Sequence, residues 1–269
     1  MGISFGISDV GLTRQSNQDN FLIDEALGLV AVADGMGGHD GGEIASAEAL
    51  SSLPPILRRS LELSGDDAFV SSDPSDDDVT LRDENMPAIA TLFEALELAN
   101  NKIYNLNLDA LSPEGCGMGT TLTGFWKYMQ DGPLISFHVG DSRLYRHRHG
   151  ETTQLTRDQT SYQEALDAGA TDFLPPRNFL LQAIGPKKTI EPEINAHATM
   201  PGDIYLLCSD GLHSATSDDE INDILSDATD ENLGQVCERL DDHQRARPQG
   251  PLPGDGSRVV VEVAGDEAA

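Results

Sequence analysis

The first buried strand of this chain is predicted by seven residues, Leu29-Val30-Ala31-Val32-Ala33-Asp34-Gly35. An unbroken apolar run of this length is typical of a strand that is covered on both faces. The run ends on Asp34, and a carboxylate at the edge of a core costs free energy unless a positive group meets it. Because Asp-Gly is also an ordinary turn dipeptide, this exit alone is weak evidence for a functional site.

Two later apolar runs end in the same way, Ile135-Ser136-Phe137-His138-Val139-Gly140-Asp141 and Tyr205-Leu206-Leu207-Cys208-Ser209-Asp210-Gly211. Each is predicted to be a buried strand with a carboxylate at its exit. A further candidate, Asp255, lies just before the last predicted strand, Val259 to Val263. Carboxylates that repeat at strand exits favour a site for a hard metal cation.

The composition limits the partners that this chain can bind. Its 269 residues include 46 acidic and 17 basic side chains, for a formal net charge of −29. This charge opposes binding to nucleic acid and to anionic membranes, because affinity for phosphate groups depends on Lys and Arg. We therefore expect neither partner, and an anionic substrate would need local positive charge from Arg or a bound metal. The acidity is explained equally well by solubility.

Length and cysteine content favour a single domain in a reducing compartment. A chain with 38% hydrophobic residues can bury a sizeable core. No internal repeat or long linker divides it, so we expect one domain over residues 1–265. Three widely spaced cysteines, Cys116, Cys208 and Cys237, indicate reduced thiols in a cytoplasmic protein. The sequence opens with no recognisable leader, and no apolar run reaches the ~18 residues of a membrane span.

Successive hairpins dominate the predicted secondary structure. Asp131-Gly132 and His149-Gly150 are good hairpin turns, and we expect the histidines around the second turn to lie on the surface. Strands are predicted at 3–9, 21–24, 29–33, 120–128, 134–139, 143–147, 152–155, 204–209 and 259–263. Helices are predicted at 41–53, 87–106, 161–168, 218–225 and 232–240. The first helix is expected to stop or bend at Pro54-Pro55. The pattern favours an α+β fold with antiparallel sheets covered by helices.

One acidic segment differs in character from the rest. Residues 64–85 are rich in Asp and contain little that could be buried. We predict a mobile surface loop, inserted into the domain at about 64–86. A calcium loop is the alternative, but Asp76-Asp77-Asp78-Val79-Thr80-Leu81 lacks the central glycine and the later ligands that such a loop requires.

The candidate metal ligands are all oxygen donors. Carboxylates and backbone carbonyls suit Mg²⁺ or Mn²⁺ rather than Zn²⁺, and Cys and His do not occur at zinc spacing. Around Asp34 the glycines are crowded, and such a turn lets backbone come close to an ion or a ligand. These glycines are Gly35, Gly37, Gly38, Gly41 and Gly42. A flexible loop is the alternative.

Six motifs, in one order along the chain, resemble those of bacterial metal-dependent protein phosphatases of the 2C family. They are Arg14-Gln15-Ser16-Asn17-Gln18-Asp19, Asp34-Gly35-Met36-Gly37-Gly38-His39, Gly119-Thr120-Thr121, His138-Val139-Gly140-Asp141-Ser142-Arg143-Leu144-Tyr145-Arg146, Gln154-Leu155-Thr156-Arg157-Asp158 and Cys208-Ser209-Asp210-Gly211-Leu212. The resemblance covers nearly the whole chain.

The resemblance implies a fold and a metal centre. The fold is a central sandwich of two antiparallel sheets flanked by helices on both outer faces, an α-β-β-α arrangement with two Mn²⁺ or Mg²⁺ ions at one end. Asp34 is then expected to bridge both ions, and the Gly35 carbonyl to hold one of them. Asp210 and Asp255 complete the protein ligands, and Asp141, with Asp210, offers a possible third metal position.

The resemblance also implies an activity. The chain is expected to be a serine/threonine protein phosphatase, in which a hydroxide that bridges the two ions attacks phosphorus in line. Arg14 is expected to bind the substrate phosphate, and Asp19 to anchor metal-bound water. His39 lies near enough in sequence to protonate the leaving group, although a structural role is equally open. The expected partners are phosphoproteins modified by a serine/threonine kinase, and the expected state is a monomer.

Three departures from the family pattern leave alternatives open. The usual closing Asp-Asn is replaced by Asp255-Gly256-Ser257-Arg258, Gln159 stands where many bacterial members have His, and Met36 where the eukaryotic branch has a candidate general acid. A pseudophosphatase scaffold and a phosphohydrolase acting on a small phosphate ester are the alternatives. The retained carboxylates favour an active enzyme.

Overall fold

The computed structural model describes residues 3–8, 17–37, 41–67, 85–112, 116–129, 132–246 and 258–263. Within these ranges, no helix is both long enough and apolar enough to cross a membrane. Three of the predicted site residues, Arg14, His39 and Asp255, lie outside the described residues, as does most of the acidic segment.

The strands form two antiparallel sheets. The five-stranded sheet has the order β1 (Ile3–Ser8), β11 (Arg258–Val263), β10 (Ile204–Cys208), β7 (Arg143–Arg148) and β8 (Glu151–Gln154). The six-stranded sheet has the order β2 (Asp19–Asp24), β3 (Leu29–Met36), β5 (Leu122–Trp126), β6 (Leu134–Val139) and β9 (Glu193–His197), with β4 (Gly119–Thr120) paired to β3. Antiparallel sheets accompanied by helices were predicted from the sequence, and this part of the prediction is confirmed.

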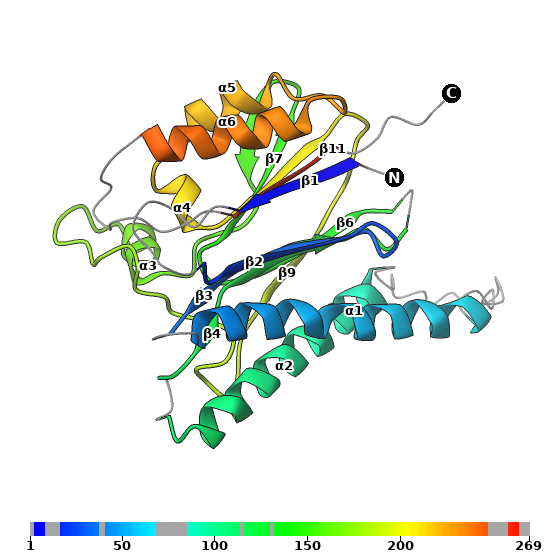
Figure 1. Ribbon diagram of the computed structural model, residues 1–269, viewed down its shortest axis with the longest axis vertical. Coiled ribbons are helices and arrows are strands. Elements are labelled where there is room, and N and C mark those ends of the chain that lie inside the picture. Colours follow the sequence, from blue (N-terminus) through cyan, green and yellow to red (C-terminus); the bar gives the residue numbers. More distant parts are fainter. Residues whose placement is uncertain are drawn as a thin grey trace, which may run out of the picture.

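The helices gather on two sides of the sheets (Figure 1). Helices α1 (Gly41–Asp67) and α2 (Met86–Asp109) lie beside the six-stranded sheet, and α5 (Asp218–Leu225) and α6 (Leu233–Ala246) beside the five-stranded sheet. The short helices α3 (Ser161–Asp167) and α4 (Asp210–His213) lie at one end.

Three apolar clusters stabilise this arrangement. One joins the six-stranded sheet to α1 and α2, and a second joins the five-stranded sheet to α5 and α6. The third contains side chains of both sheets, among them Val32 and Phe125 from one and Tyr205 and Leu207 from the other. The rings of Phe125 and Tyr205 have centroids 5.6 Å apart. Their burial contributes on the order of 2 kcal/mol for each large side chain.

Helix α1 does not stop at its proline pair, which was one of the two outcomes predicted, and it runs past the predicted end at residue 53. It continues through Pro54 and Pro55 to Asp67, so residues 64–67 are helical rather than part of a surface loop. Each proline removes one hydrogen bond of the helix. Leu53 and Leu57 are fully buried on either side of the pair. Their burial contributes roughly 1.5–3 kcal/mol each and offsets the loss.

Helix α2 buries a more polar face than its pattern suggested. Phe93 and Leu106 fall on the same face of the helix as Leu92 in the apolar pattern of the sequence, but they are 41% and 36% exposed. Asn100 and Asn107 are buried instead. Both amides bond to loop backbone: Asn107 to Met118 and Gly185, and Asn100 to the carbonyls of Lys187 and Lys188. These bonds offset the cost of burying polar groups.

The hairpin between β7 and β8 was predicted correctly, but one of its histidines was not. His149 and Gly150 both have positive φ, 54° and 83°, as a two-residue hairpin turn of this kind requires. His147 is only 6% exposed, and its Nδ1 lies 2.9 Å from the Thr152 hydroxyl. The surface assignment of His147 is therefore wrong, because the cross-strand threonine satisfies a ring nitrogen in the interior.

Candidate metal centre

The three strand exits come together in the structure. Asp34 lies near the end of β3, Asp141 follows β6, and Asp210 is the first residue of α4, directly after β10. The pKa of Asp34 is raised well above its ordinary value, first by burial and then by the negative charges of Asp19, Asp210 and Asp141. Carboxyl groups from both sheets therefore act on one another at this end of the molecule.

Asp19 is placed opposite Asp34 by the register of β2 and β3. Directly opposed residues of an antiparallel pair project from the same face of the sheet. Asp19 is 2% exposed, and its Oδ2 accepts a hydrogen bond of 2.9 Å from the hydroxyl of Ser209. Since Ser209 precedes Asp210, this bond ties β2 of one sheet to the exit of β10 in the other.

The Gly-Thr-Thr motif holds the backbone of Asp34. The Asp34 N–H donates to the Thr121 hydroxyl at 2.9 Å, so a side chain replaces the backbone acceptor of an ordinary ladder. The Asp34 carbonyl accepts from the Thr121 N–H and the Thr120 hydroxyl, both at 2.9 Å. The ladder between β3 and β5 ends at the pair of Val32 and Thr123, just before this exchange. The two threonines thus fix the end of β3 that carries the carboxylate.

Gly35 is required by close backbone packing. A Cβ at this position would lie 2.1 Å from the Gly42 carbonyl oxygen and 2.5 Å from that of Gln18, which no side chain tolerates. The Gly35 N–H donates to the Gln18 carbonyl at 3.2 Å. The described glycines near Asp34 therefore bring three backbone segments together, which explains them better than a flexible loop would.

The main chain around Asp141 is held from two directions. Gly140 has a φ of +112°, and a Cβ there would meet the Thr121 side chain at 2.7 Å. Gln159 binds both sides of Gly140: its side-chain oxygen accepts from the Gly140 N–H at 3.0 Å, and its own N–H donates to the Gly140 carbonyl at 2.8 Å. His213 Nε2 lies 3.0 Å from the Asp141 carbonyl. Neither Gln159 nor His213 was predicted as a site residue.

The charge of Asp141 is unfavourable in this setting. Burial raises its pKa to about 8, with further contributions from the carboxylates of Asp210 and Asp158, against the opposing effect of Arg143. His213 is affected in the opposite sense: burial, then Arg143, lowers its pKa to about 3, so the imidazole is neutral. His213 therefore supplies no positive charge to these carboxyls.

Arg143 offsets the rise in the pKa of Asp141 only in part, because its guanidinium is already engaged with Asp158. Its Nε and Nη2 donate to both oxygens of Asp158, at 2.8 and 2.7 Å, and its Nη1 donates to the Tyr145 hydroxyl at 2.9 Å. Burial alone would raise the pKa of Asp158, but these bonds hold it below its ordinary value. Arg143 is therefore a structural partner of Asp158 rather than a free anion-binding group.

The donor set fits a hard divalent cation. All the groups that meet here are oxygen donors, which Mg²⁺ and Mn²⁺ prefer. The raised pKa values of Asp34 and Asp141 arise partly from mutual repulsion, which a cation would relieve. Within the described ranges, no three Asp, Glu, His or Cys side chains lie close enough to enclose an ion by themselves. Carboxylates repel one another over longer distances than those at which they share a metal ion. The raised pKa values therefore agree with the lack of a closed ligand cluster among the described residues.

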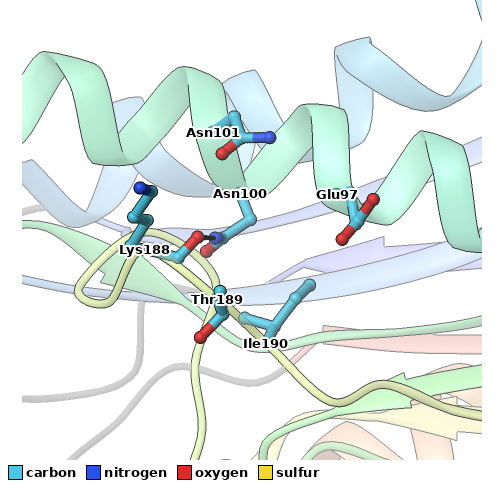
Figure 2. A pocket seen from close by; sticks show the side chains of 6 residues that line it. All are labelled: Glu97, Asn100, Asn101, Lys188, Thr189 and Ile190. Carbon is cyan, nitrogen blue, oxygen red and sulfur yellow. Dashed lines mark hydrogen bonds between the residues drawn. The ribbon is translucent and has the colours of Figure 1, made fainter.

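A shallow cavity of about 140 Å³ lies apart from these carboxylates, beside α2 (Figure 2). It is lined by Glu97, Asn100, Asn101, Lys188, Thr189 and Ile190, none of which is a predicted site residue. Behind it, the Asn100 side chain accepts from the Gly185 N–H at 2.7 Å. The neighbouring Ile184 exchanges two backbone hydrogen bonds with Thr120. The cavity therefore lies where α2 supports the threonines that hold Asp34.

The sequence and structure were then compared with known proteins. Residues 13–249 match the family model described as Protein phosphatase 2C. The serine/threonine protein phosphatase PstP of Mycobacterium tuberculosis is 33% identical over 223 residues, which cover 81% of this chain but 38% of PstP. The protein phosphatase PhpP of Streptococcus pneumoniae is 34% identical over 229 residues, or 82% of each chain.

The fold is also similar to that of a solved phosphatase structure. The catalytic domain of PstP in complex with two manganese ions aligns with a TM-score of 0.76 at 30% identity. The alignment covers 98% of this chain and 99% of that domain. This chain therefore aligns with nearly the whole catalytic domain of PstP.

Proposed function

This chain belongs to the protein phosphatase 2C family, and on that premise we propose that it is a metal-dependent serine/threonine protein phosphatase. The observation that carries the proposal is the meeting of Asp34 with Asp19, Asp210 and Asp141 across two sheets. Such a group of buried carboxyls is unfavourable without a cation. The manganese ions of the PstP catalytic domain indicate which kind of cation it is.

We assign the metal ligands as follows. Asp34 would be shared between two Mn²⁺ or Mg²⁺ ions, the Gly35 carbonyl would hold one of them, and Asp210 and Asp255 would complete the set. Asp141, together with Asp210, offers a third position. When bound, the ions supply an activated water as the nucleophile and neutralise charge on the phosphoryl group.

The chain's own residues orient the reactants. Asp19, which accepts a hydrogen bond of 2.9 Å from Ser209 and is paired with Asp34 in the strand register, anchors water beside the metal site. Arg14 binds the substrate phosphate, a role that Arg143 cannot fill because Asp158 occupies its guanidinium. His39 is the candidate that protonates the leaving seryl or threonyl oxygen.

The finer architecture and the biological setting belong to the same proposal. The four layers form an α-β-β-α sandwich, which the three apolar clusters support. The substrates are phosphoproteins, opposed by a serine/threonine kinase, and the chain acts as a monomer. Cys116, Cys208 and Cys237 are not paired in disulfides, which fits a reducing cytoplasm.

The test is hydrolysis of a phosphothreonine peptide by the purified chain, with a free phosphorylated metabolite as the competing substrate. We expect activity that requires Mn²⁺ or Mg²⁺, disappears with EDTA and returns when metal is restored. Asp34→Asn should abolish nearly all turnover while the fold is retained, whereas Asp223→Asn, at an exposed position of α5, should behave as wild type. Full activity in a metal-free sample, or in folded Asp34→Asn, would contradict the proposal.

A further inference from the structure

Helix α4 carries two polar groups at the metal-binding end of the molecule. It is a single turn that begins at Asp210 and ends at His213. Residues three apart lie on the same side of a helix, so the carboxylate and the imidazole project in similar directions. The turn is anchored from beneath by Leu212, which is fully buried against α5 and α6. The position of His213 is therefore tied to that of Asp210.

His213 extends from this turn to the other sheet. Its Nε2 lies 3.0 Å from the carbonyl oxygen of Asp141, which follows β6. A carbonyl oxygen can only accept a hydrogen bond, so Nε2 must carry the proton. This assignment follows from geometry alone. The His213 side chain thus connects the backbone of Asp141 to the helical turn that begins with Asp210.

The bond acts where repulsion would otherwise separate the two residues. The carboxylates of Asp141 and Asp210 repel each other. Gln159 holds the Gly140 peptide next to Asp141, but Gln159 belongs to the segment after β8 and makes these bonds to Gly140, not to α4. The His213 bond instead spans the gap between the exits of β6 and β10. It can therefore keep the spacing of the two carboxylates in the metal-free protein.

We propose that His213 is a positioning residue that holds Asp141 and Asp210 at the spacing needed for the third divalent cation. The inference rests on the proposed function, in which these two carboxylates form that site. It assigns no contact between His213 and the metal or the substrate. Because His213 acts through the Asp141 backbone, its removal should lower the metal affinity of the third position, which is the weakest site.

The test compares Mn²⁺ binding to the full chain, by calorimetry, in three variants. Asp141→Asn identifies the relevant class of sites by losing it. His213→Leu removes the donor and should weaken that class about three- to tenfold, as expected for one hydrogen bond. His213→Gln can place an amide N–H near the position of Nε2 and should recover most of the affinity. His243→Leu, at an exposed position on α6, is the matched control.

A spectroscopic measurement tests the bond itself. In wild-type protein labelled with ¹⁵N histidine, His213 should be the Nε2–H tautomer with a slowly exchanging proton, before any metal is added. An Nδ1–H tautomer would overturn the inference even if His213→Leu failed to fold. Unchanged Mn²⁺ affinity in folded His213→Leu would also overturn it, as would survival of the weakest site in Asp141→Asn. Loss of all Mn²⁺ binding in wild type would instead refute the proposed function.

Discussion

Removing the charge of Asp141 should stabilise the metal-free protein, and the gain should grow with pH. Its pKa is raised from 3.8 to about 8. Between these values the folded protein keeps a proton that the unfolded chain has released. The stability associated with this group is therefore fully present below pH ~4 and is lost as the pH rises through the folded pKa. Asparagine cannot ionise, so the Asp141→Asn variant does not lose this stability as the pH rises.

The magnitude follows from proton linkage. One group that is protonated in the folded state and ionised in the unfolded state changes the unfolding free energy by about 1.4 kcal/mol per pH unit. Between pH 6.5 and 7.5 the advantage of Asp141→Asn should increase by about 1 kcal/mol. This window avoids the histidines whose pKa is lowered, such as His138 and His213. The contribution of such a histidine to the free energy of unfolding increases with pH only up to about pH 6.5, the ordinary pKa of histidine.

The assay is urea unfolding of both proteins in EDTA at pH 6.5 and 7.5, with Asp223→Asn as an exposed-carboxylate control that should shift by less than about 0.5 kcal/mol. Adding Mn²⁺ at a hundred times the dissociation constant of the site that Asp141 completes should stabilise wild type by about 2.7 kcal/mol relative to Asp141→Asn and so narrow the difference. The reasoning fails if metal-free Asp141→Asn is less stable than wild type at pH 7.5. It also fails if the difference between them does not widen with pH.

Three further changes give separate tests. Thr121→Val leaves the Asp34 N–H without its hydroxyl acceptor and should cost about 1–3 kcal/mol in urea unfolding; the exposed control Thr153→Val should cost little, and equal losses would contradict the role of Thr121. Arg14→Ala should lower kcat/KM about tenfold to a hundredfold, and loss of Mn²⁺ binding with unchanged KM would argue against phosphate contact. Replacing residues 68–84 with a short Gly-Ser linker should alter salt-dependent activity on protein substrates but not on a small phosphate ester; a large drop in Tm would show that the segment is structural.

Strands that are buried on both faces were the easiest elements to predict. Strand β6 has the predicted bounds, Leu134–Val139, and all of its side chains are buried. Its sequence is apolar apart from Ser136 and His138, and a strand of this composition requires cover on both faces. The edge strand β9 was missed for the opposite reason. Its sequence, Glu-Ile-Asn-Ala-His, has weak strand propensity and depends on its neighbour, as the bond between His197 and the Ser136 hydroxyl shows.

Local rules failed where packing outweighed them. A proline pair predicts the end of a helix, but the buried leucines on either side of Pro54 and Pro55 keep α1 intact. Likewise, the apolar periodicity of α2 includes Phe93, which is exposed, and gives no sign of Asn100, which is buried. A polar residue on a helix's buried face is explained only once its loop partners are known.

Asp34, Asp141 and Asp210, which the structure brings near one another, could be singled out from the sequence because each follows an apolar run, and that signal is local. The residues that hold them in place could not. Thr121, Gln159 and His213 act through bonds to backbone groups that are 87, 19 and 72 residues away in sequence. Thr121 belongs to the Gly-Thr-Thr motif, but only the structure shows that its hydroxyl accepts the hydrogen bond that a backbone carbonyl would accept in an ordinary β-ladder. No spacing in the sequence marks such long-range partners.

The position of β11 has a consequence for synthesis on the ribosome. This strand lies between β1 and β10, pairing with both, although it is the last strand described (Figure 1). The six-stranded sheet needs only residues up to His197, so it can assemble while translation continues. The five-stranded sheet stays divided, with β1 separated from β10, until residue 263 has left the exit tunnel. A nascent chain therefore carries Asp34 in an assembled sheet before the exit of β10 is fixed against it, and the carboxyls of the two sheets should come together only once β11 has joined.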